Sequence, residues 1–147
     1  MGGTRTDMLL DERAAAEPTA LPLERPVTLY AASDQAAQSV PPEGIRIASF
    51  PFHIGRRPAG REPAPATTVM LQVADVRPYR LSRLHFSVVR NGEGFAVSDL
   101  ASTLGTVVNG EPVGEMFAST QAPLREGDNE VVAGGDGSPY VFRIVVG

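Results

Sequence analysis

The sequence predicts an all-β fold, a sandwich of two antiparallel sheets with about 10–11 strands in total. Short segments rich in β-branched and aromatic residues recur along the chain, separated at close intervals by Gly, Asn and Pro turn signals. The last segment, residues 140–146, alternates strictly between apolar and other positions. No stretch has a convincing long helical period, so the chain of 147 residues is expected to form one domain around a β core.

Residues 1–24 are expected to be a flexible tail, and residues 25–147 the folded domain. The tail mixes charges, alanines and prolines without a sustained apolar period. No segment approaches the roughly 18 apolar residues of a membrane span, and the start of the chain lacks the pattern of a signal peptide. Because the sequence has no cysteine, disulfides and thiolate metal sites are excluded. We expect a cytoplasmic location and no membrane partner.

The first strand is predicted within residues 25–30. Apolar alternation over residues 45–54 slips in phase near Pro51, which cannot donate to a ladder, so we expect a bulge or an edge position there. The proline-rich residues 58–66 are expected to form a loop, and Asn109 and Gly110 a type I′ hairpin turn. Further strands are predicted at residues 69–73, 84–89, 95–100, 106–108, 111–113, 129–133 and 140–146.

All 13 basic side chains of the sequence are arginine. Alanine, glycine and proline are abundant too, so genomic composition explains this better than function. The net charge of −4 disfavours a nucleic-acid partner, which usually meets a basic excess. An arginine is therefore informative only where the backbone aims its guanidinium at a phosphate or a carboxylate.

A polar cluster, Arg-Leu-Ser-Arg-Leu-His at residues 80–85, runs directly into an alternating apolar segment. Its first half presents a hydroxyl and two guanidinium groups, while apolar residues at period-two spacing can anchor the loop to a sheet. We expect the ligand of the protein to meet this loop.

Four segments resemble, in order and spacing, the signature blocks of the forkhead-associated (FHA) domain family: residues 55–56, 82–85, 99–110 and 124–128. The resemblance covers nearly everything except the tail. It implies a sandwich of the SMAD/FHA type and a non-enzymatic module that recognises phosphothreonine on a partner protein in kinase-dependent signalling or assembly. The partner so implied is a Ser/Thr kinase or its substrate, and no cofactor or metal is expected.

A phosphothreonine carries about −1.5 to −2 charges and three acceptor oxygens, so it needs donors from several directions. Arg56 can offer two parallel N–H bonds, Ser82 a hydroxyl and Arg83 further charge. By resemblance, Arg56 and Ser82 match the principal phosphate contacts of the family, and Thr103 matches a further contact in the second loop. Arg57 is left outside the site.

The remaining candidate residues shape the site. Gly55 and Gly105 serve backbone geometry, and the resemblance implies that His85 braces the loop. Arg80 is placed to meet an acidic group on the third residue after the phosphothreonine. Leu104 stands where the family usually has an asparagine that binds the peptide backbone, and the loss of those hydrogen bonds costs about 1–2 kcal/mol.

Two alternatives stay open. Because of Leu104, the site could be degenerate and serve as a phospho-independent interaction surface. A small serine hydrolase using Ser82, His85 and Asp99 is more remote, since no Gly-x-Ser-x-Gly elbow is present. A metal site is disfavoured because the two histidines lie on different segments.

The tail offers a further candidate ligand. If Thr4 or Thr6 were phosphorylated, the tail could fold back at high effective concentration and occupy the site.

Overall fold

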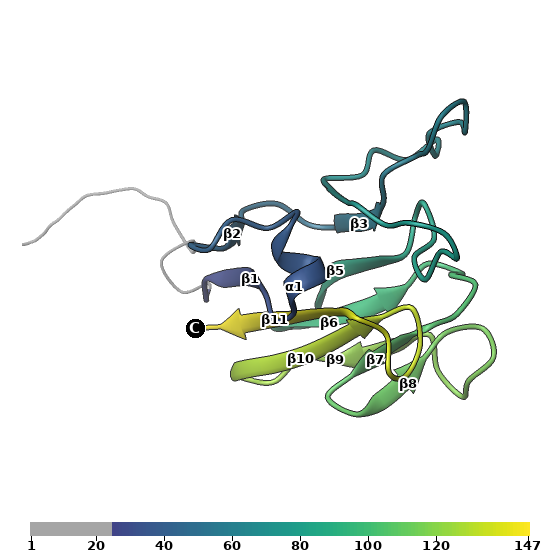
Figure 1. Ribbon diagram of the computed structural model, residues 1–147. Coiled ribbons are helices and arrows are strands. Elements are labelled where there is room, and N and C mark those ends of the chain that lie inside the picture. Colours follow the sequence, from purple (N-terminus) through teal and green to yellow (C-terminus); the bar gives the residue numbers. More distant parts are fainter. Residues whose placement is uncertain (1–24) are drawn as a thin grey trace, which may run out of the picture.

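The computed structural model describes residues 25–147 and forms a sandwich of two β-sheets (Figure 1). The elements are β1 Val27–Ala31, α1 Asp34–Ala37, β2 Ile45–Ile47, β3 Phe52–Arg56, β4 Leu71–Val73, β5 Phe86–Asn91, β6 Gly94–Asp99, β7 Thr106–Val108, β8 Glu111–Val113, β9 Gln121–Pro123, β10 Gly127–Ala133 and β11 Tyr140–Val146. The first sheet has the strand order β2-β1-β11-β10-β7-β8, and the second has the order β4-β3-β5-β6-β9. The prediction of an all-β sandwich is confirmed, whereas the tail predicted for residues 1–24 lies outside the described residues.

The core lies between the two sheets. Alternate residues of β11 are buried as the sequence pattern predicts, namely Tyr140, Phe142, Ile144 and Val146. Phe142 of the first sheet meets Phe86 of the second, with ring centroids 6.0 Å apart. Each such fully buried side chain stabilises the fold by about 1.5–3 kcal/mol, so this contact helps to hold the sheets together.

Residues 45–54 form two strands that belong to different sheets. β2 pairs with β1, whereas β3 pairs with β4 and β5. The slip in phase near Pro51 therefore marks the passage of the chain from one sheet to the other. The expectation of a bulge is wrong, although β2 does lie at a sheet edge.

β3 and β4 run parallel, which departs from the predicted purely antiparallel arrangement. Parallel neighbours need a long connection, because the chain must return to the starting end of the first strand. Residues 57–70 make that connection, and this loop extends beyond the end of β3 in Figure 1. The proline-rich loop predicted from the sequence is thus the crossover between two neighbouring strands.

One end of the sandwich collects the loops that bear the polar signatures. Ile54 of β3 lies opposite Phe86 of β5, which in turn lies opposite Asp99 of β6. The end of β3, the start of β5 and the end of β6 therefore meet at this edge. The backbone N–H of Gly134 donates to the carbonyl of Gly105 at 3.0 Å, which adds the β10–β11 loop to the group.

Candidate functional site: a pocket between end loops

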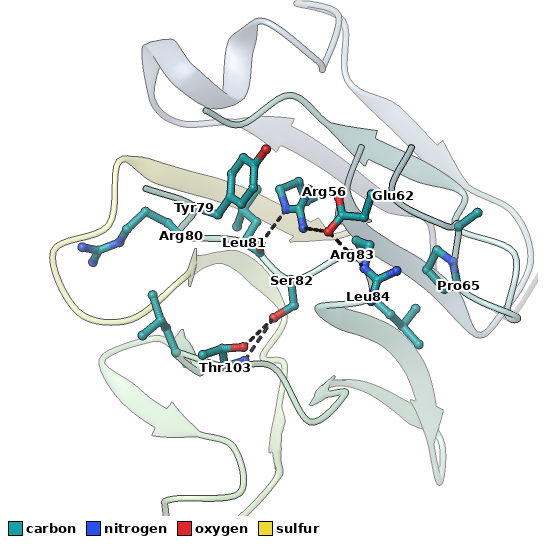
Figure 2. Close-up of a pocket in the computed structure, with 12 residues that line it drawn as sticks. Arg56, Glu62, Pro65, Tyr79, Arg80, Leu81, Ser82, Arg83, Leu84 and Thr103 are labelled. Carbon is teal, nitrogen blue, oxygen red and sulfur yellow. Dashed lines mark hydrogen bonds and ion pairs between the residues drawn. The ribbon is translucent and has the colours of Figure 1, made fainter. Parts of the chain in front are cut away.

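The end loops surround a pocket of about 680 Å³ (Figure 2). It is lined by residues from the end of β3, the 57–70 loop, the loop before β5 and the loop between β6 and β7. The structure brings together in this one pocket all the residues proposed to contact phosphate or peptide: Arg56, Arg80, Ser82, Arg83, Thr103 and Leu104. Gly55, His85 and Gly105 lie around it and shape its loops.

Gly55 allows the loop before β5 to lie directly against β3. A Cβ atom at this position would lie 2.0 Å from the carbonyl oxygen of Arg83. The close approach is secured by backbone hydrogen bonds on either side: the N–H of Arg56 donates to Ser82 at 2.8 Å, and the N–H of His85 donates to Ile54 at 3.0 Å. The position requires glycine because of this contact between backbones.

Arg56 extends from the last position of β3 into the pocket and is only 5% exposed. Its Nε donates to the carbonyl of Leu81 at 3.0 Å, and its guanidinium lies 3.9 Å from the centre of the Tyr79 ring. Its two terminal nitrogens donate to the two carboxylate oxygens of Glu62, at 2.6 and 2.8 Å (Figure 2). The guanidinium is therefore fixed in orientation by a carbonyl, a ring and a carboxylate.

Glu62 is a site residue that the sequence reasoning missed. It lies in the proline-rich crossover loop and also accepts a hydrogen bond from the backbone N–H of Ala59 at 3.1 Å. Its carboxylate is 3.5 Å from Nε of Arg83. The hydrogen bond from Arg56, followed by that from Ala59, lowers the pKa of Glu62 to about 2. The one sequence signal for Glu62 is its position six residues after Arg56, which ends β3.

Ser82 and Thr103 connect the two loops that face Arg56. The backbone N–H of Thr103 donates to Oγ of Ser82 at 3.0 Å, and the two hydroxyl oxygens are 3.5 Å apart (Figure 2). Both hydroxyl groups border the pocket. They provide neutral donors on the side opposite the guanidinium of Arg56.

His85 is fully buried beneath these loops. Its Nδ1 accepts the backbone N–H of Ser82 at 3.0 Å, and its Nε2 lies 2.9 Å from the carbonyl oxygen of Gly105. Nε2 must therefore carry the proton and donate it to that carbonyl. Burial lowers the pKa of His85, which favours this neutral form. With both ring nitrogens bound to backbone, His85 is not placed to act as a base toward the Ser82 hydroxyl.

Asp99 holds the loop between β6 and β7 in shape. Its carboxylate accepts hydrogen bonds from the N–H and Oγ of Ser102, at 3.0 and 2.7 Å, and from Oγ1 of Thr106 at 2.6 Å. Oγ of Ser102 in turn accepts the N–H of Gly105 at 2.9 Å. Asp99 therefore supports the loop between β6 and β7, whereas the hydrolase alternative would give it a catalytic role.

Asp75 anchors the start of the loop before β5 and was also missed. It accepts the backbone N–H groups of Arg80 and Leu81, at 2.9 and 3.0 Å, and the hydroxyl of Tyr140 at 2.6 Å. The loop is thereby tied to β11 of the other sheet. Burial and the bond to Asp75 raise the pKa of Tyr140.

Arg80 and Leu104 both line the pocket and lie close to Gly135, where an added Cβ atom would be 3.9 Å from Nη2 of Arg80 and 3.8 Å from Cβ of Leu104. In Figure 2 the guanidinium of Arg80 points away from Arg56. Leu104 is 37% exposed and also lines a second pocket of about 360 Å³, to which Phe117, 40% exposed, contributes. An apolar surface therefore adjoins the polar pocket directly at Leu104.

Comparison with known proteins places the chain in a family. A family model for the FHA domain matches residues 52–130. Together with the two-sheet sandwich and its polar pocket between end loops, this match identifies a phosphopeptide-binding class of β-sandwich module. The chain belongs to the FHA domain family, and the resemblance found in the sequence is confirmed.

Solved structures support the fold. The FhaA FHA domain, determined in complex with the intracellular domain of Rv3910, gives a TM-score of 0.53 at 21% identity, covering 80% of this chain and 98% of that one. An FHA domain described for phosphothreonine-dependent interactions gives 0.56 at 20% identity, covering 83% and 97%. The Mycobacterium tuberculosis Rv1747 FHA-1 domain gives 0.55 at 18% identity, covering 84% and 98%.

No curated protein matches the sequence. Within residues 25–147, no helix is long and apolar enough to cross a membrane.

Proposed function

We propose that the pocket binds the phosphothreonine side chain of a partner protein without catalysing a reaction. The observation that carries the proposal is the placement of Arg56, an almost buried guanidinium that faces two hydroxyl groups from other loops across one pocket. Arg56 and Arg83 supply charge to the phosphate, and Ser82 and Thr103 supply hydroxyl donors. Each charge-assisted bond contributes about 1.5–3 kcal/mol, so two of them separate a phosphorylated from a plain peptide by several orders of magnitude.

The peptide itself is proposed to run past Arg80 and Leu104. Arg80 provides a guanidinium that favours an acidic residue, three positions after the phosphothreonine by family analogy. Leu104 replaces the amide that usually holds the peptide backbone and presents an apolar side chain instead. We infer phosphothreonine recognition with altered anchoring of the peptide, in a cytoplasmic setting where a Ser/Thr kinase or its substrate is the partner.

Peptide titration tests the proposal. Fluorescence anisotropy with matched phosphothreonine, phosphoserine and threonine peptide libraries should show the strongest binding for phosphothreonine at low salt. Arg56→Ala should abolish the difference between phosphorylated and plain peptides. The matched control is Arg57→Ala, because Arg57 is exposed and does not line the pocket. Equal binding of the phosphothreonine and threonine libraries by the wild-type protein would overturn the proposal.

A phospho-independent interaction surface is the second candidate function. It is favoured by the exposed apolar side chains Leu104, Met116 and Phe117, whose exposed fractions are 37%, 68% and 40%. For such a surface, Phe117→Ser would weaken capture of the partner and phosphatase treatment of the partner would not. For the leading proposal, phosphatase treatment alone would abolish capture.

The tail remains a proposed intramolecular ligand through phosphorylated Thr4 or Thr6, which lie outside the described residues. Mass spectrometry after incubation with active kinase tests this proposal. The absence of tail phosphorylation would contradict it.

A further inference from the structure

The terminal edge of the Arg56 guanidinium is already filled by a carboxylate of the same chain. Nη1 and Nη2 donate to the two oxygens of Glu62 at 2.6 and 2.8 Å, while Nε donates to the carbonyl of Leu81 at 3.0 Å. A planar guanidinium offers its paired terminal donors to one anion at a time. A phosphate that binds Arg56 in the same forked geometry must therefore replace Glu62.

Arg83, the second cationic contact proposed for the phosphate, is engaged by the same segment. Its Nη1 donates to the carbonyl of Pro63 at 2.6 Å, and its Nε lies 3.5 Å from the carboxylate of Glu62. Residues 59–63, hereafter the latch segment, thus contact both proposed phosphate-binding arginines. Figure 2 shows the carboxylate of Glu62 between the guanidinium groups of Arg56 and Arg83.

The latch segment can leave without opening the core. No residue from 57 to 70 is buried, and the Glu62 side chain is 28% exposed. Displacement therefore exposes little apolar surface, and it exchanges contacts with a carboxylate for contacts with an incoming anion. Local openings of this kind cost far less free energy than global unfolding.

We propose that Glu62 is an internal competitor for the phosphate subsite and a determinant of ligand charge. The inference rests on the proposed function. A phosphate group brings about −1.5 to −2 charges and three acceptor oxygens, whereas Glu62 brings one charge and two oxygens. Phosphothreonine therefore displaces Glu62, while the single carboxylate of a peptide does not.

Tethering explains why a peptide carboxylate fails. Glu62 lies six residues from Arg56 along the chain, and a short tether gives an effective concentration in the millimolar range. A free peptide at micromolar concentration with an aspartate or glutamate in place of phosphothreonine cannot compete with the same chemical group held in place. The site rejects acidic mimics of phosphothreonine for this reason.

Removing the competitor should strengthen binding. A latch closed in about nine molecules of ten weakens apparent affinity about tenfold, so Glu62→Gln and Glu62→Ala should tighten phosphothreonine-peptide binding by roughly three- to tenfold. Both variants should also gain measurable binding to a peptide with glutamate in place of phosphothreonine. Glu93→Gln is the matched control, because Glu93 is exposed in the β5–β6 turn and its substitution removes the same charge away from the residues that line the pocket.

Isothermal titration calorimetry of the full chain, with thermal melting of each variant, tests the proposal. In an Arg56→Ala background, Glu62→Ala should lose most of its gain in phosphothreonine-peptide binding, because the forked contact of Glu62 is made with that guanidinium. Unchanged or weaker binding by folded Glu62→Gln and Glu62→Ala would overturn the latch while leaving phosphothreonine recognition intact. If the wild-type protein and both Glu62 variants bind phosphorylated and plain peptides equally, the proposed function and the latch both fail.

Discussion

Protonation of His85 should uncouple the two loops that form the pocket. Nδ1 accepts the N–H of Ser82 at 3.0 Å, and Nε2 lies 2.9 Å from the carbonyl oxygen of Gly105. An imidazolium has no acceptor nitrogen, so protonation removes the bond from Ser82 and leaves a charge in a fully buried position. This burial lowers the pKa of His85 in the folded protein.

The sign of the pH dependence follows from that shift. Histidine in the unfolded chain titrates near pH 6.5, above the folded pKa of His85, so the unfolded state binds more protons below this pH. The stability that depends on neutral His85 is complete above about pH 6.5 and is lost as the pH falls toward the folded pKa. Within that window the free energy of unfolding should fall by up to about 1.4 kcal/mol per pH unit.

Urea denaturation of the ligand-free protein at pH 7.5, 6.5 and 5.5 measures this slope. His85→Gln should lower the free energy of unfolding at pH 7.5 by about 1–3 kcal/mol, because buried partners lose their hydrogen bonds, and it should also flatten the slope. His53→Gln, which removes the other histidine of the chain, is the matched control and should keep the slope. Equal wild-type stability at pH 7.5 and 5.5, or an undiminished slope in His85→Gln, would refute the reasoning.

Three further substitutions, the first with a matched control, test the architecture of the pocket. Gly55→Ala places a Cβ atom 2.0 Å from the carbonyl oxygen of Arg83, and should lower the free energy of unfolding by about 1–3 kcal/mol or more. Gly94→Ala, whose Cβ would meet its nearest neighbour at 3.7 Å, should have a smaller effect in the same denaturation assay. Leu104→Asn should tighten phosphothreonine-peptide binding about tenfold by restoring one or two hydrogen bonds to the peptide; unchanged affinity in calorimetry would contradict that role. Arg80→Ala should flatten any preference for Asp or Glu at the third residue after the phosphothreonine on a peptide array, and a preserved preference would exclude the assignment.

The sequence predicted the fold well where the signal is local. Alternation in residues 140–146 reports burial on one face of a strand, and the structure has β11 there with its alternate side chains buried. Residues 45–54 show where local signals end. A slip in alternation is expected both at a bulge and where a chain changes sheets, and only tertiary pairing distinguishes the two. Strand direction is likewise absent from a local pattern, so the parallel pairing of β3 and β4 was not predicted.

The motif residues of the site were predicted, whereas the residues whose role depends on contacts between distant segments were not. The residues carried by the FHA motifs lie around one pocket, because motif spacing reflects a conformation shared by the family. Asp75 and Glu62 belong to no motif. Asp75 acts through a hydrogen bond to Tyr140, 65 residues away along the chain. Glu62 lies in a loop without periodicity, and its role depends on how the crossover between β3 and β4 folds back over Arg56.

Leu104 and Glu62 both reduce the affinity for a peptide, but they act on different parts of it. Leu104 removes contacts that a peptide backbone would make whether or not it is phosphorylated, and Glu62 raises the charge that a ligand must bring to reach Arg56. Both features lower the affinity for a phosphorylated peptide, but only Leu104 increases the share of the binding free energy that comes from the phosphate, because the phosphate itself must displace Glu62. Because charge-assisted contacts near a surface are screened by ions, binding that depends on them should weaken steeply with salt. Leu104→Asn should therefore raise the affinity for phosphorylated and plain peptides by the same factor and leave the ratio of the two affinities and its salt dependence unchanged, whereas Glu62→Gln should raise only the affinity for the phosphorylated peptide.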